Sequence, residues 1–377
     1  MSATPDEQVQ ADQEVLRRLP AILRREGYFD SYSSERPLHL QFRWMRERLH
    51  LLPDTLRTLT TLFFLGEPVP DEALRGVFLG SELDALERLG ILLHHEGQQG
   101  IGALALLPLL GQLVFVPWAK PAKQDAAFSD ESAAHAARTA PPRHARCLDL
   151  YAGPGHLTVR CATLAESVVA VDVSPVALAC AKLNVVLNSV DDRASIREGE
   201  VADVVGPEAS FDYVTATPPT LPYPPEFPVL GRAVSGDDGL LVLRRTLAQV
   251  ARLLAPDGTA QLLATAPGDQ AGPHFLRELP EFAAEHALHI ITTLPRRTRM
   301  RAGDALFEEL ARTCAPSVRP RPADLEAARE RLTRYLGERD AAYLYSLRMT
   351  ITASAPRPGL QVVEHFRVES SDDEWRG

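Results

Sequence analysis

A short segment in the middle of the chain combines residue types that can bind a nucleotide-like ligand. In RCLDLYAGPGHLTVRCA, residues 146–162, a strand-like run ends near Asp149, and Gly153 and Gly155 precede an expected helix. Glycine has no Cβ, so a ligand can approach the backbone closely at the head of that helix. Thr158 stands where a dinucleotide-binding GxGxxG motif would have its third glycine. The Asp149 carboxylate would repel a pyrophosphate and attract a cation, which predicts a positively charged nucleoside as the ligand.

A second carboxylate, Asp172, lies 23 residues beyond Asp149 at the end of the apolar run VVAVDV. An acidic side chain at the end of the second strand can accept hydrogen bonds from both ribose hydroxyls of a nucleoside. Ser174 and Pro175 then supply the N-cap and the first residue of the next helix, so the alternative is that Asp172 only helps to cap it. Glu200 is expected near the adenine amino group or, alternatively, in a solvated turn.

A proline-rich loop follows the strand-like run FDYVTAT. Six of the twelve residues in TPPTLPYPPEFP are proline, so this loop loses little entropy when it becomes ordered. It leaves the carboxyl end of a central strand, where doubly wound sheets bind ligands. We therefore expect catalytic roles for Thr217 and Tyr223, and acceptor contacts from Pro218, Pro219 and Tyr223. The alternatives are a surface polyproline linker and, for Tyr223 and Phe227, packing within the loop.

Four motifs together resemble the class I S-adenosylmethionine-dependent methyltransferases of the HemK-like or small-domain group. From about residue 146 to residue 266, the strand D-x-x-x-G-x-G, the acidic second strand, the NPP-type loop and the DGL…LxPGG turn read DLYAGPG, VDVSP, TPP and DGL…LAPDG. The resemblance implies S-adenosylmethionine as the cofactor and a methyltransferase as the enzyme class. The expected cofactor-binding residues are Asp149, Ala152, Gly153, Gly155, Asp172, Val173, Glu200, Val201 and Thr217.

Thr217 departs from that pattern, because the family has Asn before the two prolines. The Asn amide offers a donor and an acceptor side by side to a planar amide or exocyclic amine, and threonine cannot reproduce this pairing. The main expectation is therefore methyl transfer to a small molecule, such as a specialised natural product, in biosynthesis. One alternative is transfer to RNA or protein, favoured by the basic stretch PRRTRMR, residues 295–301, unless this is a solvated loop. Another is a non-methylating enzyme, such as a cyclase, that reuses the fold.

In-line transfer from a sulfonium mainly requires an acceptor that is aligned and shielded from water, effects that can supply ~7–11 kcal/mol. His156, Asp237 and Asp238 are candidate bases by position, with structural roles at helix ends as the alternative. Cys314 is expected to be structural. The segment LDLYAGPGHLTV also resembles RNA uridine C5-methyltransferases, whose nucleophilic cysteine follows a late strand. The segment TCAP around Cys314 lies instead in an apparent helix or loop.

Strand-like and helical patterns divide the chain into three parts. Residues 146–377 contain seven apolar runs separated by helical segments, which predicts an α/β fold with a Rossmann-like, doubly wound, seven-stranded sheet. Residues 1–118 predict helices followed by a hairpin, LLHHEGQQGIGALALL, as in a winged helix. Such a domain could grip a substrate or only pack. Residues 119–145, rich in Ala, Pro and charge, predict a linker with a short helix over residues 130–139.

Composition limits the remaining possibilities. With 377 residues, 45% hydrophobic and 24% charged, the chain is typical of a globular protein with two domains. Its net charge of -10 argues against a surface built mainly to hold nucleic acid. The four cysteines form no CxxC pair, which favours reduced thiols and no metal. The apolar run 101–118 is interrupted by Pro108, Gly111 and Gln112, so we expect a buried hairpin, no membrane partner and a cytoplasmic protein.

Overall fold

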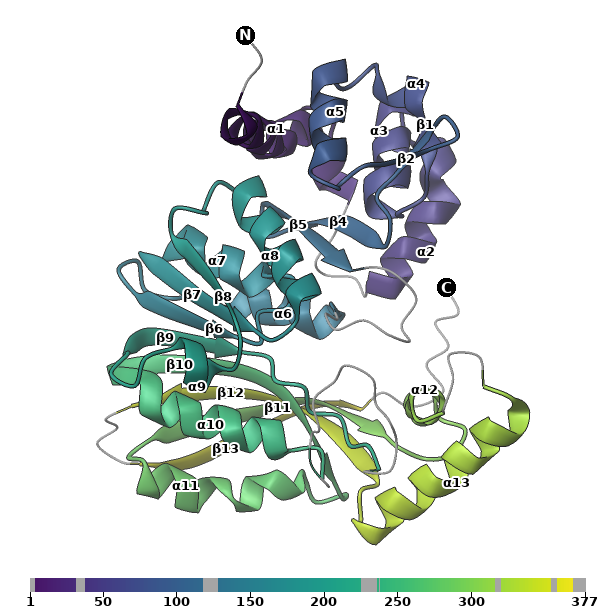
Figure 1. The fold of residues 1–377 in the computed structure, drawn as a ribbon. Helices are drawn as coiled ribbons and strands as arrows, with labels where there is room; N and C mark the ends of the chain where they lie inside the picture. The colour runs from purple at the N-terminus through teal and green to yellow at the C-terminus, as the bar shows by residue number, and fades with distance from the viewer. Residues whose placement is uncertain are drawn as a thin grey trace. The chain divides into compact units, whose positions relative to one another are not determined.

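The computed structural model describes residues 4–31, 38–117, 128–224, 236, 238–315, 320–353 and 358–368 (Figure 1). Phe227, Asp237 and the predicted domain boundary near residue 118 lie outside these ranges. Contacts divide the chain into two compact units. Unit 1 comprises residues 1–144 and 152–200, and unit 2 comprises residues 145–151 and 201–377. The three predicted domains stay a prediction.

Unit 1 begins with a long capped helix, α1 (Pro5–Arg25). The Thr4 hydroxyl accepts the Glu7 N–H at 3.3 Å, and the Glu7 carboxylate accepts the Thr4 N–H at 2.7 Å. This reciprocal pair satisfies two of the donors that a helix start leaves open. The helices that follow are η1 (Tyr28–Ser31), α2 (Leu38–Arg48), η2 (Leu49–Leu51), α3 (Asp54–Leu59), η3 (Thr60–Phe64), α4 (Asp71–Leu74) and α5 (Gly80–Arg88).

Two hairpins follow these helices. β2 (Leu93–His95) and β3 (Gln98–Gly100) pair antiparallel, and β3 also pairs with β1 (Val69–Pro70). The apolar run 101–118 forms the hairpin of β4 (Leu104–Leu109) and β5 (Gln112–Pro117), as predicted. Both turns place two successive residues at positive φ, which suits two-residue hairpins. Within the described residues, no helix is long and apolar enough to cross a membrane.

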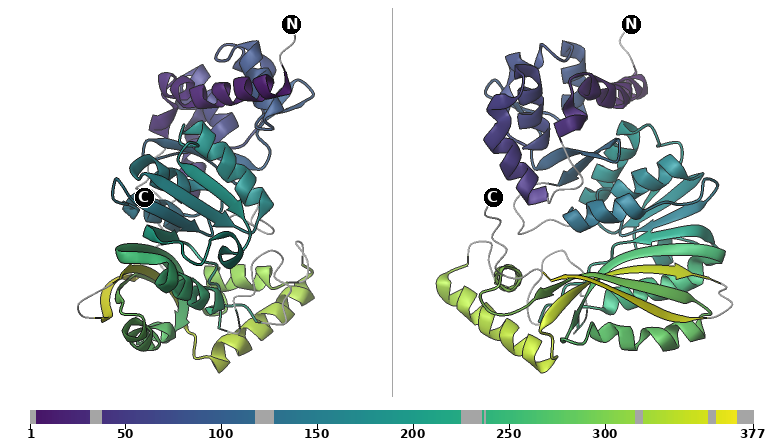
Figure 2. Two further views of the ribbon diagram at one scale, coloured as in Figure 1. Left: turned by 60° about the vertical axis from the view of Figure 1, so that its left-hand side comes forward. Right: turned by 180° about the vertical axis from the view of Figure 1, so that it is seen from behind.

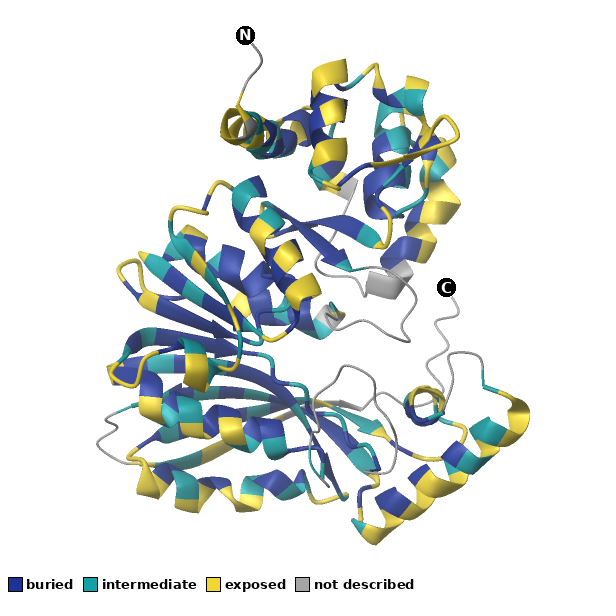
Figure 3. Ribbon diagram, viewed as in Figure 1, coloured by how far each residue is buried: buried dark blue, intermediate teal, exposed yellow. Residues whose placement is uncertain are grey.

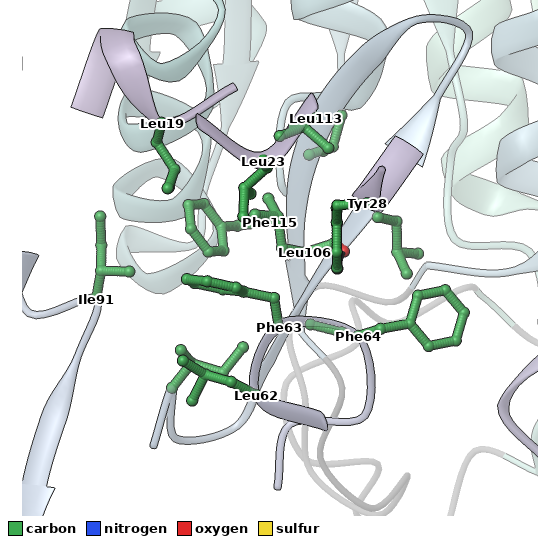
Figure 4. Close-up of a cluster of buried hydrophobic side chains, with 14 of the residues drawn as sticks. Leu19, Leu23, Tyr28, Leu62, Phe63, Phe64, Ile91, Leu106, Leu113 and Phe115 are labelled. Atoms are coloured by element: carbon green, nitrogen blue, oxygen red, sulfur yellow. Dashed lines mark hydrogen bonds between the residues drawn. The ribbon is translucent and has the colours of Figure 1, made fainter. Parts of the chain in front are cut away.

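A single apolar cluster joins α1, the π-helix η3 and β5 (Figure 4). Leu19 and Leu23 of α1 pack with Phe63 and with Phe115 of β5. The same cluster also includes residues from two helices much later in the chain, namely Leu157, Cys180 and Leu187. Those helices flank the glycine turn, so the N-terminal core and the turn share one packing unit.

The later part of unit 1 contains a helix before the glycine turn and the helices and strands that follow the turn. They are α6 (Asp130–Arg138), α7 (His156–Leu164), β7 (Ser167–Asp172), α8 (Pro175–Leu187) and β8 (Ala194–Glu198). β7 and β8 are parallel, with Asp172 opposite Glu198. Ser174 is the N-cap of α8 and accepts the Ala177 N–H at 3.3 Å, and Pro175 opens the helix, as predicted.

Unit 2 is built on a mixed sheet with α10 and α11 packed along it (Figure 2). Its strands lie in the order β6–β9–β10–β12–β11–β13, where β12 is antiparallel to both neighbours and the other pairs are parallel. The strands are β6 (Arg146–Leu150), β9 (Phe211–Ala216), β10 (Leu254–Gly268), β11 (His289–Arg299), β12 (Tyr343–Thr352) and β13 (Gly359–Val368). The helices are α9 (Val201–Val204), α10 (Leu241–Leu253), η4 (His274–Arg277), α11 (Leu279–Glu285), α12 (Ala305–Thr313) and α13 (Pro322–Glu338).

The α/β class and all seven predicted strands are confirmed, and β13 adds a strand to the sheet of unit 2 that was not predicted. Helix α10 buries Leu243, Leu247 and Val250, which recur every three or four residues, and exposes its other side (Figure 3). The basic stretch 295–301 is not a loop over most of its length, because Pro295 to Arg299 belong to β11.

The register of unit 2 places several strand ends at one edge. β6, β9 and β10 are parallel, and β11 runs in the same direction because both β10 and β11 are antiparallel to β12. Gly268 and Arg299 both pair with Tyr343, so the carboxyl ends of β10 and β11 are level. The ends of β6 and β9 are level with each other and with Leu262, before the end of β10. Doubly wound sheets bind their ligands at the carboxyl ends of their parallel strands.

Candidate functional site

The glycine turn of unit 1 has a conformation that only residues without a Cβ adopt easily. Gly153 has a φ of 55° and Gly155 a φ of 77°. A Cβ added at Gly155 would lie 2.7 Å from the Cβ of Ala181 in α8. The Ala152 N–H donates to Val171 O at 3.1 Å, and the Gly155 N–H donates to Ala152 O at 2.9 Å. The turn is therefore tied to β7 and packed closely against α8.

Asp172 of β7 fixes the same turn from a second direction. Its Oδ2 accepts the Gly153 N–H at 2.8 Å, and its Oδ1 accepts the Ser174 N–H at 2.9 Å. The contact with Ser174 matches the helix-capping alternative, and the contact with Gly153 adds a role in the turn. An ionised carboxylate has about four acceptor positions. Asp172 can therefore accept further hydrogen bonds from a diol while it holds both backbone amides.

Four other residues predicted to bind the cofactor lie in the glycine turn or shortly after the ends of β7 and β8. In unit 1, Ala152 is buried, whereas Val173 is 57% exposed and Glu200 is exposed after the end of β8. Val201, the first residue of α9 in unit 2, is half-buried. Exposed groups at strand ends are available to a ligand, and the cofactor role of these four residues stays a prediction.

In unit 2, β6 carries Asp149 one residue from its end. The side chain is fully buried, and the residue pairs with Thr215 of β9. Tyr151 follows at a φ of 59°, a left-handed value that costs a non-glycine residue about 1–3 kcal/mol. Its hydroxyl lies 3.1 Å from the Thr246 Oγ1 of α10. Such strain is concentrated at functional sites, and no residue type in this segment signals it.

The start of the proline loop is held against β10. The Thr265 N–H donates to the Thr220 Oγ1 at 2.7 Å, and the Thr265 Oγ1 donates to Thr220 O at 2.5 Å. Gly239, at a φ of 78°, approaches so closely that an added Cβ would lie 2.9 Å from Pro222. The Thr217 Oγ1 is buried and has no hydrogen-bond partner within the part of the chain that the structure describes. A fixed loop thus presents an unsatisfied hydroxyl beside the end of β9.

Tyr223, the other predicted catalytic residue, packs against the cluster formed by α12, α13 and the ends of β11 and β12. That cluster includes Met300, which follows β11 directly. This packing is outside the loop and so differs from the alternative of packing within it, and the catalytic role of Tyr223 stays a prediction. Pro218 is buried and Pro219 half-buried at the start of the same loop. Their contacts with an acceptor stay predictions.

Asp238 and His156, two of the candidate bases, have environments that oppose proton uptake. Burial would raise the pKa of Asp238, but the hydrogen bonds from Arg244, at 2.6 Å, and from the Leu240 N–H keep that pKa below its usual value. Burial and the neighbouring His135 lower the pKa of His156 to about 3. Neither group therefore takes up a proton readily near pH 7.

Cysteines and metal-ligand groups add little to this site. All four cysteines are buried and none forms a disulfide, and Cys314 follows α12 in the core, as a structural residue would. Among the described residues, Asp269, His274 and Asp340 bring three ligand atoms within 4.8 Å of one another. The Asp269 carboxylate already lies 3.5 Å from the His274 Nε2 and 3.7 Å from the Arg277 guanidinium. The expectation of no metal stays a prediction.

The family model and the two curated relatives described here that match this chain are methyltransferases. Residues 124–220 match the TRM5/TYW2 methyltransferase domain. The ribosomal protein uL3 glutamine methyltransferase of Bordetella pertussis is 34% identical over 128 residues, 31% of this chain and 42% of that protein. The tRNA1(Val) (adenine(37)-N6)-methyltransferase of Porphyromonas gingivalis is 26% identical over 154 residues, 39% of this chain and 56% of that protein. The chain thus spans about half the length of the curated relatives it matches.

Among solved structures, Trm5b from Pyrococcus abyssi has a TM-score of 0.41 and 14% identity and covers 70% of this chain and 62% of its own. The M. jannaschii tRNA m1G37 methyltransferase has a TM-score of 0.39 and 12% identity, with 68% and 60% covered. The match to the methyltransferase domain and the curated relatives confirm the predicted class I methyltransferase and S-adenosylmethionine as its cofactor.

Proposed function

We propose that this class I methyltransferase transfers a methyl group from S-adenosylmethionine to RNA. The cofactor part is carried by the Asp172 carboxylate, which accepts the Gly153 and Ser174 amides and keeps acceptor positions for a ribose. The RNA part is supported by the tRNA methyltransferase among the relatives. Tyr223, in the loop that begins at Thr217, packs against the cluster that contains Met300, which lies between Arg299 and Arg301 after β11, and this arrangement supports it further.

The residues present fit the cofactor. Asp172 would bind the ribose hydroxyls, Gly153 and Gly155 would allow close approach to the backbone, and Asp149 would offset positive charge. When bound, S-adenosylmethionine supplies a methyl group on a sulfonium, which is a good leaving group. The chain then has to bind the acceptor, align it and exclude water. The proline loop would do this, since Thr220 is hydrogen-bonded to Thr265 of β10 and Pro222 lies close to Gly239, just before α10.

Tritiated S-adenosylmethionine and an extract of total cell RNA, protein and metabolites test the proposal. We expect label in a fraction that is sensitive to ribonuclease and resistant to protease. An Asp172→Ala variant, which loses both amide contacts, should bind the cofactor at least tenfold more weakly in calorimetry. Label confined to protein or to low-mass compounds would overturn the RNA acceptor. Absence of cofactor binding by the unaltered protein would overturn the whole proposal.

A small-molecule acceptor is the second candidate, and Thr217 favours it. The single buried hydroxyl can donate one hydrogen bond to an acceptor, whereas the family's Asn offers a donor and an acceptor in one plane. A Thr217→Asn variant separates the two candidates. If the acceptor is an RNA base, the variant should keep or raise the rate of RNA methylation. A low-mass product lost in the variant favours the second candidate.

A further inference from the structure

Asn184 of α8 and Asn188, the C-cap residue of the same helix, complete the open edge of strand β5 in unit 1. The Asn184 Oδ1 accepts the Phe115 N–H at 2.7 Å, and its Nδ2 donates to Phe115 O at 2.8 Å. Asn188 does the same for Leu113, at 3.2 Å and 2.7 Å. Four residues of helix rise about 6 Å and two residues of strand about 6.7 Å, so the side-chain amides match the strand repeat.

Asn184 makes one bond that Asn188 does not. The second hydrogen of its Nδ2 donates to Pro154 O at 2.7 Å, and Pro154 lies between the two glycines of the turn. The second hydrogen of the Asn188 amide instead donates to Asn184 O within α8, at 2.8 Å. Asn184 is completely buried, and its hydrogen bonds use both of its N–H groups and its carbonyl oxygen.

The contact with Pro154 links the turn to the N-terminal core. Phe115 and Leu113 carry side chains that are buried in the cluster of α1, η3 and β5 (Figure 4). Their backbones are bound by the two asparagines, and one of these asparagines also binds the turn. A displacement of the β4–β5 hairpin therefore moves Asn184, whose Nδ2 donates to Pro154 O in the turn. Ordering of the turn restrains the hairpin through the same residue.

We infer that Asn184 is a positioning residue that couples the β4–β5 hairpin of the N-terminal core to the conformation of the glycine turn. This inference rests on the proposed function only in that the turn binds S-adenosylmethionine. Coupling between two sites is reciprocal in free energy. Loss of the Asn184 contact should thus weaken cofactor binding, and the bound cofactor should stabilise β5.

The variants Asn184→Leu and Asn188→Leu form a matched pair. Both remove an amide from α8 and leave the backbone of one β5 residue without its partner, so both should lower thermal stability. We expect the cofactor dissociation constant to rise about tenfold in Asn184→Leu, the size of one neutral hydrogen bond, and less than twofold in Asn188→Leu. Equal effects in the two variants, or an unchanged constant in Asn184→Leu, would overturn the inference.

Hydrogen exchange on the unaltered protein keeps the inference testable if a variant does not fold. Saturating adenosylhomocysteine should slow exchange at residues 152–156 and also at residues 113–116, with residues 93–100 of the other hairpin unchanged. Protection of the turn without protection of β5 would contradict the coupling alone. If the unaltered protein binds neither compound in calorimetry, the proposed function fails and the inference fails with it.

Discussion

His156 shows at the scale of one residue how burial turns a candidate base into a structural group. Both ring nitrogens are buried without a hydrogen-bond partner among the described residues, and the ring packs edge-on against Phe128. The folded-state pKa of about 3 lies below the ordinary 6.5. Between these values the unfolded chain binds a proton that the folded chain does not. The contribution of neutral His156 to the free energy of unfolding is therefore fully present above pH 6.5 and is lost as the pH falls from 6.5 towards 3.

A His156→Leu variant should lose this acid sensitivity. From pH 6.5 to pH 5, the free energy of unfolding of the unaltered protein should fall by up to ~1.4 kcal/mol per pH unit more than that of the variant. Urea titrations at several pH values measure this difference. His95→Leu is the control, because the His95 side chain is 86% exposed. Parallel curves for His156→Leu and the unaltered protein would show that His156 is not buried in its neutral form.

At this scale the sequence predicted the groups whose role is local. Asp172 and the two glycines could be recognised because a strand, a turn and a helix define their positions within a few residues. Tyr151 could not be recognised, since nothing in its type signals a left-handed backbone. Asn184 left a weak signal, two asparagines four residues apart at the end of a mainly apolar helix, but their partner strand lies about 70 residues earlier.

At the scale of the element, the close packing of the glycine turn on α8 can be tested by adding one methyl group. Gly155→Ala imposes both a φ of 77° on alanine and a 2.7 Å contact with the Ala181 Cβ. Gly111 offers a matched control, because it has a φ of 80° and an added Cβ would meet nothing within 4 Å. The control variant Gly111→Ala should cost about 1–2 kcal/mol for its backbone alone.

Gly155→Ala should cost about 1–3 kcal/mol more than the control, since overpacking is added to the backbone strain. Chemical denaturation measures both values. The double variant Gly155→Ala with Ala181→Gly should regain part of that difference, because it removes the nearest atom. If Gly155→Ala costs no more than Gly111→Ala, the turn does not pack against α8 as described.

The elements that escaped prediction depend on distant partners. β13 pairs only with β11 among the described strands, and its exposed Val362 weakens the alternation that marks a half-buried strand. The secondary structure of the basic segment at the end of β11 was ambiguous in the sequence, because the pairing of β11 with β12 shifts its register between Thr293 and Arg296. Helices α7 and α8, by contrast, begin where the glycine turn and the Ser174 cap predict, since these signals are contained in a few neighbouring residues.

At the scale of the whole molecule, the net charge of -10 is a sum over the chain and does not describe where the charges lie on the surface. Arg296, Arg299 and Arg301 are exposed at the carboxyl end of β11. Met300, between the last two, belongs to the cluster that Tyr223 of the proline loop packs against. Composition could not reveal this basic surface, because the proline loop after β9 and the end of β11 are far apart in the sequence. They come together at the cluster that contains Met300. A local basic surface is therefore compatible with an acidic protein.

The salt dependence of RNA binding tests whether this surface holds the acceptor. Each phosphate contact on a single strand contributes about -0.7 to the slope of log K against log salt concentration. The double variant Arg296→Gln and Arg301→Gln should therefore reduce the slope by about 1.4 with cofactor affinity unchanged. The double variant Arg146→Gln and Arg252→Gln changes the charge equally at the amino ends of β6 and β10, so its slope should match that of the unaltered protein. Equal slopes in the two double variants would mean that RNA responds to net charge and not to the end of β11.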